Sequence, residues 1–163
     1  MKLGSTLSVG ITGLVGTVVN VEAHVAAGLP AFTISGLPDA ACAQSPSRVR
    51  AAAIVAGHPL PSDRVTVNLS PSALPKRGSG FDLPIACAVL AAQGVIPAAT
   101  TAGTVHLGEL GLDGTIRPVP GVLPAVAAAA AAGVERVVVP PGNATEAGLV
   151  EGIAVHSFAR LAD

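Results

Sequence analysis

Aromatic side chains are nearly absent from this sequence of 163 residues: they make up 2% of it, and tryptophan and tyrosine do not occur. Proteins that recognise bases or sugars by stacking need flat aromatic surfaces, so this composition argues against that class. Charge is scarce too, with 12% charged residues and a formal net charge of -1 at pH 7. A strongly basic nucleic-acid-binding chain is therefore excluded, although a local basic patch is not.

Cysteine and long apolar runs are also in short supply. Cys42 and Cys87 belong to no CxxC motif, and each lies among small apolar residues. We expect both to be buried thiols in a reducing, cytoplasmic compartment. Residues 1–8 lack the apolar core of a signal peptide, and the alanine run at 127–132 is too short to span a membrane.

Histidines are few and scattered, and no two of them have the spacing of metal ligands on one helix or strand. We therefore expect no metal site and no bound cofactor in this chain. The four histidines are His24, His58, His106 and His156.

What the sequence does have is hydrophobic residues, which make up 50% of it. In a chain of this length they are enough for one domain, residues 1–163, with a core. Strict alternation of apolar and polar residues predicts strands. Predicted strands are 19–25, 31–35, 64–70, 137–139 and 153–155; predicted helices are 45–56, 83–92 and 125–132. We expect the first two strands to pair as a hairpin, and a second hairpin, between 104–107 and 115–119, to turn at Asp113-Gly114. The order of elements predicts an α+β domain.

The segment PKRGSGFDLPIA, residues 75–86, raises a question of chemistry. Its glycines suit a turn, and Asp82 is placed to cap the helix that follows. Lys76 and Arg77 remain unexplained, because two cations before a helix can either bind an anion, such as DNA phosphate or a partner's carboxylate, or form a solvated edge. A Walker phosphate loop, GxxxxGK followed by Ser or Thr, is absent, so the segment does not predict a nucleotide site.

Four stretches together resemble one known family. The chain is similar to the N-terminal domain of magnesium-chelatase-like AAA+ ATPases of the ComM/YifB type, from near Leu7 to about Arg160. The stretches are GLPAFTISGLPDAA (28–41), RVRAA (48–52), RVTVNLSPSALPKRGSGFDLPIA (64–86) and LGELGLDGTIRPVPGVLPAV (107–126). The resemblance implies the fold of the Lon protease catalytic domain, with a mixed β-sheet and packed helices.

The same resemblance implies that the Lon-type catalytic dyad is missing. Lon proteases use a serine nucleophile in a segment similar to 75–82 and a lysine base in one similar to 119–125. Aligned on these segments, the two positions hold Gly80 and Leu123, neither of which can react. Ser79 is one place away, and we expect no base beside it.

The family members continue into an AAA+ module with Walker motifs, so the resemblance implies that this chain is part of a longer protein. Such a parent would bind ATP and Mg²⁺ in the module expected after Asp163 and assemble as a ring, with six subunits expected. The ComM branch remodels DNA by branch migration during uptake of foreign DNA. The chain itself would be non-catalytic and would assist ring assembly, DNA engagement or both.

Two alternatives stay open at this point. One is a serine hydrolase that uses Ser79 on the Lon scaffold, and the other is a domain that contacts protein alone. For DNA or partner contact, the candidate residues are Lys76, Arg77, Arg48, Arg50 and Arg117. Arg48 and Arg50 lie in the stretch RVR (48–50), which matches the family, and this match favours a role in packing or assembly for these two residues.

Overall fold

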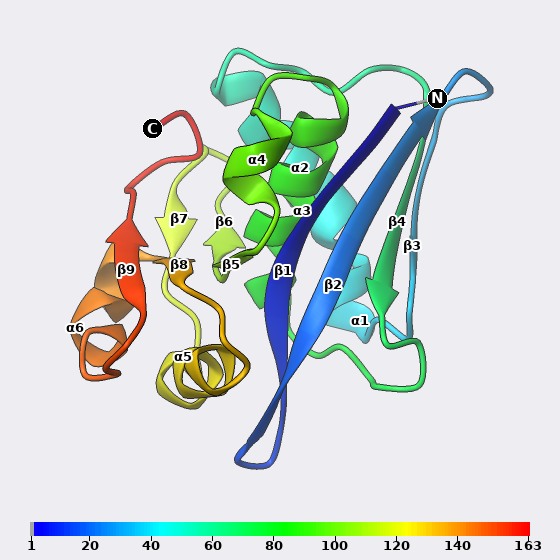
Figure 1. The fold of residues 1–163 in the computed structure, drawn as a ribbon. Coiled ribbons are helices and arrows are strands. Elements are labelled where there is room, and N and C mark those ends of the chain that lie inside the picture. Colours follow the sequence, from blue (N-terminus) through cyan, green and yellow to red (C-terminus); the bar gives the residue numbers. More distant parts are fainter. Residues whose placement is uncertain (1) are drawn as a thin grey trace.

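The computed structural model describes residues 2–163, and most of its strands lie in one seven-stranded sheet of order β3-β4-β2-β1-β5-β8-β9 (Figure 1). The sheet strands are β1 (Lys2–Thr12), β2 (Val15–Ala26), β3 (Ala31–Ser35), β4 (Arg64–Ser70), β5 (Thr104–His106), β8 (Arg136–Val139) and β9 (Ala154–Ser157). A separate two-stranded hairpin is formed by β6 (Glu109–Leu110) and β7 (Ile116–Arg117).

Helices are interspersed between the strands rather than gathered at one end of the chain. They are α1 (Ala40–Ala43), α2 (Ser45–Val55), α3 (Asp82–Ala92), α4 (Ala98–Thr101), α5 (Val122–Ala131) and α6 (Ala144–Ala147), with short 3-10 turns η1 (Ser79–Phe81) and η2 (Pro141–Asn143). Strand pairing is antiparallel for β1–β2 and β2–β4 but parallel for β3–β4, β1–β5, β5–β8 and β8–β9. The predicted α+β class with a mixed sheet is confirmed. The likeness to the Lon catalytic domain stays a prediction.

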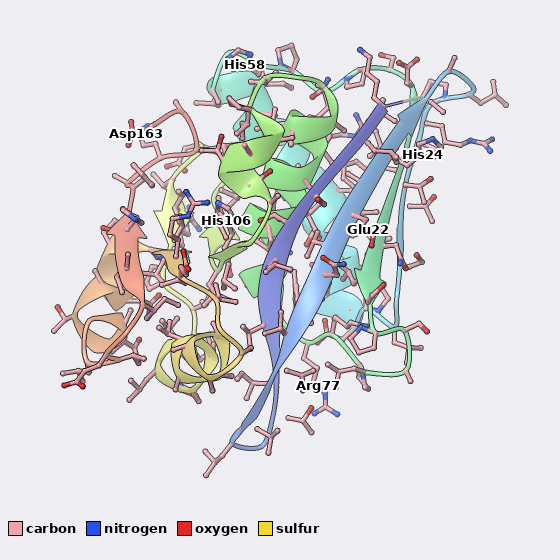
Figure 2. The ribbon with its side chains drawn as sticks, viewed as in Figure 1. Glu22, His24, His58, Arg77, His106 and Asp163 are labelled. Atoms are coloured by element: carbon pink, nitrogen blue, oxygen red, sulfur yellow. The ribbon has the colours of Figure 1, made fainter. Side chains whose placement is uncertain are left out.

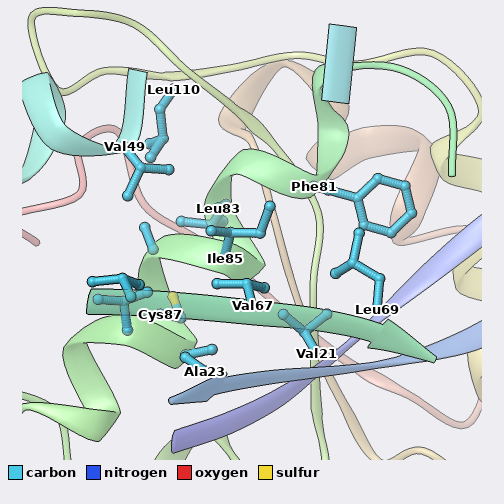
Figure 3. Packing of buried hydrophobic residues seen from close by; sticks show 14 of the residues in the cluster. Val21, Ala23, Val49, Val67, Leu69, Phe81, Leu83, Ile85, Cys87 and Leu110 are labelled. Carbon is cyan, nitrogen blue, oxygen red and sulfur yellow. The ribbon is translucent and has the colours of Figure 1, made fainter. Parts of the chain in front are cut away.

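Helix α3 is the centre of the larger core. All eleven of its residues are buried, because the helix is apolar on every side and lies between the sheet and α2. The inward residues of β2 and β4, such as Val21 and Val67, pack on it, and the alternation that predicted these strands is seen in their burial (Figure 3). Gly4 lets α3 approach closely, since a Cβ there would lie 2.1 Å from the Ala88 carbonyl oxygen.

Helix α5 covers the other face of the sheet and forms a second core with β1, β5 and β8. Gly16 of β2 faces this helix, and an added Cβ would lie 2.6 Å from the Ala128 Cβ. The helix ends at Ala131, just before Gly133, whose φ of +83° is accessible to glycine. The sheet is therefore sandwiched where β1 and β2 pass between α3 and α5.

The predicted hairpin of strands 19–25 and 31–35 is wrong, although both strands exist. β4 lies between β2 and β3, pairing antiparallel with β2 and parallel with β3. The hairpin partner of β2 is β1, which turns through Gly13-Leu14 and projects from the body of the domain (Figure 1). Alternation specifies a strand and its buried face but carries no information about its neighbour.

The Asp113-Gly114 hairpin is present, but its first strand is Glu109–Leu110 rather than the predicted 104–107. Residues 104–106 belong instead to the main sheet as β5. The turn itself follows the expected chemistry, because the Asp113 carboxylate accepts from the backbone N–H of Thr115 at 3.1 Å and Gly114 has φ +84°.

Candidate functional site

The loop before α3 reverses the chain at Gly78, whose φ of +85° is a conformation that favours glycine. Asp39 fixes the turn from outside the loop. One of its carboxylate oxygens accepts from the Gly78 N–H at 3.0 Å, and the other caps α1 by accepting from the Cys42 N–H at 2.8 Å. The loop is thereby tied to the start of α1, which positions its side chains.

Lys76 lies inside the domain, so the prediction that it forms a solvated edge or contacts phosphate is wrong. The residue has 0% exposure, and its Nζ donates to the Gly36 carbonyl at 2.7 Å and to the Pro71 carbonyl. The Lys76 backbone forms an isolated β-bridge: its N–H donates to the Leu37 carbonyl, and its carbonyl accepts from the Asp39 N–H. Burial lowers the pKa of Lys76. Carbonyl oxygens take the place of water around the Lys76 ammonium group. The ammonium group thereby joins the loop at Gly36 to the loop at Pro71.

Arg77, the next residue, is exposed and stands beside a cavity of about 400 Å³ (Figure 2). The walls are mostly apolar. They come from β1, from the loop 78–81, from Leu107 and from the segment 119–125. Arg77 supplies a cation at this wall.

The same cavity brings together the two segments that the Lon alignment pairs. Gly80 faces Val119, since a Cβ built on Gly80 would lie 3.8 Å from the Val119 methyl carbons. Val122 lines the cavity, whereas Leu123 is 38% exposed and is not among the lining residues within 2–163. The segments therefore meet as expected, with Val122 rather than Leu123 facing inward. That Gly80 and Leu123 mark a former dyad stays a prediction.

Ser79 does have a carboxylate beside it, contrary to the expectation of no base. Its hydroxyl donates to a Glu109 carboxylate oxygen. Two backbone hydrogen bonds join the segment 80–83 to Gly108, the residue before Glu109. The Gly108 N–H donates to the Gly80 carbonyl at 3.1 Å, and the Leu83 N–H donates to the Gly108 carbonyl at 3.0 Å. Glu109 lies 30 residues further along the chain, so no local motif could have indicated this contact.

Asp82 is the first residue of α3 and is fully buried, with Phe81 at the N-cap. The predicted capping role for Asp82 is therefore wrong. Its carboxylate accepts from Ser45 Oγ at 2.5 Å, from the Leu110 N–H at 3.1 Å, and from Arg48 Nε and Nη2 at 2.6 and 3.0 Å. The carboxylate is thus a hub that joins α2, α3 and β6.

The Arg48 guanidinium is paired with the Asp82 carboxylate and is not free to contact a phosphate. Its side chain is 19% exposed, and Nη2 also donates to the Ala41 carbonyl at 2.8 Å. The hydrogen bonds to Asp82 raise the pKa of Arg48, which keeps the guanidinium charged. The contact role predicted for Arg48 is wrong because its charge is already paired inside the domain.

The remaining cations differ in their surroundings. Arg50 lies over the Phe32 ring, with 5.4 Å from its guanidinium carbon to the ring centroid, in cation–π geometry. Arg77 and Arg117 are exposed. The contact role predicted for these three arginines stays a prediction, and two of them present an open charge to solvent.

Both cysteines are free and buried, as predicted. In the part of the chain that the structure describes, no cluster of three or more His, Cys, Asp or Glu side chains could hold a metal ion. None of the helices between residues 2 and 163 is long and apolar enough to cross a membrane.

Comparison with known proteins places most of the chain in one group. The family described as ChlI, subunit ChlI of Mg-chelatase, matches residues 21–143. An uncharacterized protein of Mycobacterium tuberculosis is 49% identical over 161 residues, covering 99% of this chain and 32% of that protein.

Two further relatives are 39% identical. The protein YifB of Escherichia coli matches over 134 residues, which are 82% of this chain and 26% of that protein. The competence protein ComM of Haemophilus influenzae matches over 150 residues, which are 92% of this chain and 29% of that protein. The chain spans about a third or less of the length of these curated relatives.

Proposed function

Because the chain belongs to the Mg-chelatase ChlI family and is a domain of the ComM/YifB kind, we propose that it is a non-catalytic N-terminal domain of a longer ATP-driven ring protein. In that protein it assists ring assembly and engages DNA. The parent would remodel DNA by branch migration during uptake of foreign DNA, in keeping with the description of one relative as a competence protein.

ATP and Mg²⁺ do not fit the residues present here. The sequence holds no GxxxxGK[ST] loop, and within residues 2–163 there is no carboxylate cluster suited to a metal ion. We propose that both bind another part of the longer protein, and we derive no step through them.

The β1–β2 hairpin is the observation that carries the assembly role. It projects from the body of the domain (Figure 1), and its turn presents Leu14, 90% exposed, next to Val15, 67% exposed. Exposed apolar side chains are unfavourable in water, and covering them with a partner lowers the free energy of the assembly. The proposed partner is a neighbouring copy of the same chain in the ring.

We expect the double substitution Leu14→Asp and Val15→Asp in the longer protein to weaken subunit association by at least about tenfold, since two exposed apolar side chains are replaced by charges. Light scattering after size-exclusion chromatography, with ATP present, measures the molar mass of the assembly.

Leu29→Asp is the matched control, because Leu29 is 80% exposed in the turn between β2 and β3, at the opposite end of the sheet (Figure 1). The control should assemble normally. Assembly of the double variant at wild-type concentrations would overturn the role of the hairpin, and equal loss in the control would show that it is not specific.

The DNA-engaging part of the proposal relies on Arg77 and Arg117, the candidate cations that are exposed. We expect Arg77→Ala with Arg117→Ala to weaken duplex binding alike on all sequences. The slope of log affinity against log salt should become shallower by up to about 2, because each phosphate contact contributes about 0.9. Lys2→Ala with Arg64→Ala, at exposed cations of β1 and β4, is the charge-matched control. Unchanged affinity and slope in the double variant would contradict this part and leave a purely protein-contacting domain.

A second candidate, a serine hydrolase using Ser79, has one observation in its favour: the hydrogen bond to Glu109. General-base activation of a serine usually needs a base that is itself oriented by a third group. In the described chain the Glu109 carboxylate accepts one hydrogen bond, from Ser79 itself. We therefore keep the non-catalytic proposal.

A further inference from the structure

His106 is a buried histidine of β5 that lies between β1 and the C-terminal strands (Figure 2). Its Nδ1 is 2.8 Å from Thr6 Oγ1, and the same hydroxyl is 2.9 Å from the Thr104 carbonyl oxygen. A hydroxyl has one proton, and a carbonyl can only accept, so Thr6 donates to Thr104. The contact with His106 must then use the ring N–H, which puts the proton on Nδ1 and leaves Nε2 as a bare acceptor.

Within residues 2–163 Nε2 accepts no hydrogen bond, and it is reached by solvent, since it is not one of the buried side-chain atoms that lack a partner; the residue as a whole is 8% exposed. Burial, together with the nearby charge of Arg136, lowers the pKa of His106 to about 4, so the imidazole is neutral at pH 7. A ligand that supplies an N–H or O–H would therefore take the place of water at this acceptor, inside a mostly apolar cavity.

The imidazole lines two adjoining cavities, of about 280 and about 390 Å³, which share the same central wall. That wall comes from α3, the loop before α4, α4, β5, β8 and the segment after β9. Its residues are Cys87, Ile96, Thr100, His106, Val138 and Phe158. Burial raises the pKa of Cys87 to about 12, so the thiol is neutral as well. Exposed charged side chains line the rest of the two cavities: Arg136 in the smaller one, and Arg160 and Asp163 in the larger one.

We propose that this cavity binds a small, uncharged, largely apolar molecule that donates one hydroxyl or N–H hydrogen bond to His106 Nε2. Mostly apolar walls with a small number of oriented polar groups are the usual construction of a small-molecule site. The wall shared by the two cavities carries no charged side chain, so a charged ligand would find no buried counter-ion there. The acceptor sets the class of ligand. A phenol- or indole-like molecule can donate a hydrogen bond to Nε2, whereas the methyl ether of a phenol cannot.

The site is independent of the cavity beside Arg77. The cavity beside Arg77 has no lining residue in common with the two cavities beside His106. Failure of the assembly or DNA experiments would therefore leave this proposal standing, and its own failure would leave them standing.

The probes are phenol and anisole, which differ in that anisole has no hydrogen-bond donor. With histidine labelled by ¹⁵N, nuclear magnetic resonance should show the Nδ1–H tautomer in the free protein. Phenol should shift the Nε2 resonance, and its affinity should exceed that of anisole by about tenfold, a typical gain for one buried hydrogen bond.

Two variants sharpen the result. His106→Phe keeps an aromatic ring at this position and removes the acceptor, so phenol and anisole should bind it equally. His24→Gln, on the face of the sheet away from α3, should behave as wild type. A proton on Nε2, equal affinity for the two probes in the wild-type protein, or no phenol binding up to its solubility would each overturn the proposal, even if the phenylalanine variant does not fold.

Discussion

Asp82→Ala should lower the free energy of unfolding by about 3–5 kcal/mol, the cost typical of breaking a buried ion pair by removing one partner. The carboxylate is fully buried and accepts four hydrogen bonds, from Ser45, Leu110 and both Nε and Nη2 of Arg48. Its removal leaves a buried hydroxyl, a buried backbone N–H and a part-buried guanidinium without their acceptor. Three elements, α2, α3 and β6, lose their common attachment at once.

Urea denaturation monitored by circular dichroism measures this loss. Asp82→Asn keeps an acceptor oxygen in the same place and should cost less than the alanine variant. Glu151→Ala, at an exposed acidic residue, should stay within about 0.5 kcal/mol of wild type. A double-mutant cycle with Arg48→Ala isolates the pair. A loss below about 1 kcal/mol for Asp82→Ala would show that the hub is not energetically important.

Acid should destabilise the protein through His106 well above the pH at which most carboxylates titrate. The pKa of the folded histidine is about 4, against an ordinary value of 6.5. Between these values the unfolded chain binds a proton that the folded protein does not, so lowering the pH favours unfolding. The contribution is fully present above pH 6.5 and is lost as pH falls to about 4. The total loss is about 3 kcal/mol.

The measurement is the free energy of unfolding at intervals from pH 7.5 to pH 4, for wild type and His106→Gln. The glutamine variant cannot titrate, so its curve should be flatter by the amount assigned to His106, whatever its stability at pH 7.5. His156→Gln, at an exposed histidine, provides the control for loss of an imidazole. Parallel curves for wild type and His106→Gln would contradict the prediction.

Most of the longer strands and helices could be predicted from the sequence because their signals are local, but the central strand β1 was not predicted. Alternation at 64–70 reproduces β4, and the apolar run before Gly94 gives α3 to within one residue. Strand partners could not be predicted in the same way. The pairing of β3 with β4 joins residues more than thirty positions apart, as in Phe32 with Val65, and no turn motif links them. The proximity of 19–25 and 31–35 in sequence favoured a hairpin that tertiary packing overrides.

The loop 75–82 shows the same limit at the level of single side chains. Lys76 and Arg77 are adjacent and chemically alike, yet one is buried and the other exposed. Local patterns treat them as one basic pair, whereas the carbonyls of Gly36 and Pro71 select Lys76 alone. Asp82 likewise has the sequence position of a cap, but its partners come from α2 and β6. Only the fold brings these groups together.

The place of β1 in the sheet has a consequence for the order of events in synthesis. One edge of β1 is satisfied early, by β2, which follows after a two-residue turn. The other edge can pair only when β5 has been made, because Leu7 pairs with Val105, nearly a hundred residues later. Until that part of the chain has been made, the nascent protein presents an open strand edge with unpaired backbone groups, the kind of surface that mispairs with other chains. Its productive folding therefore depends on how quickly the second half follows the first, and slow translation between them would favour aggregation or binding by a chaperone.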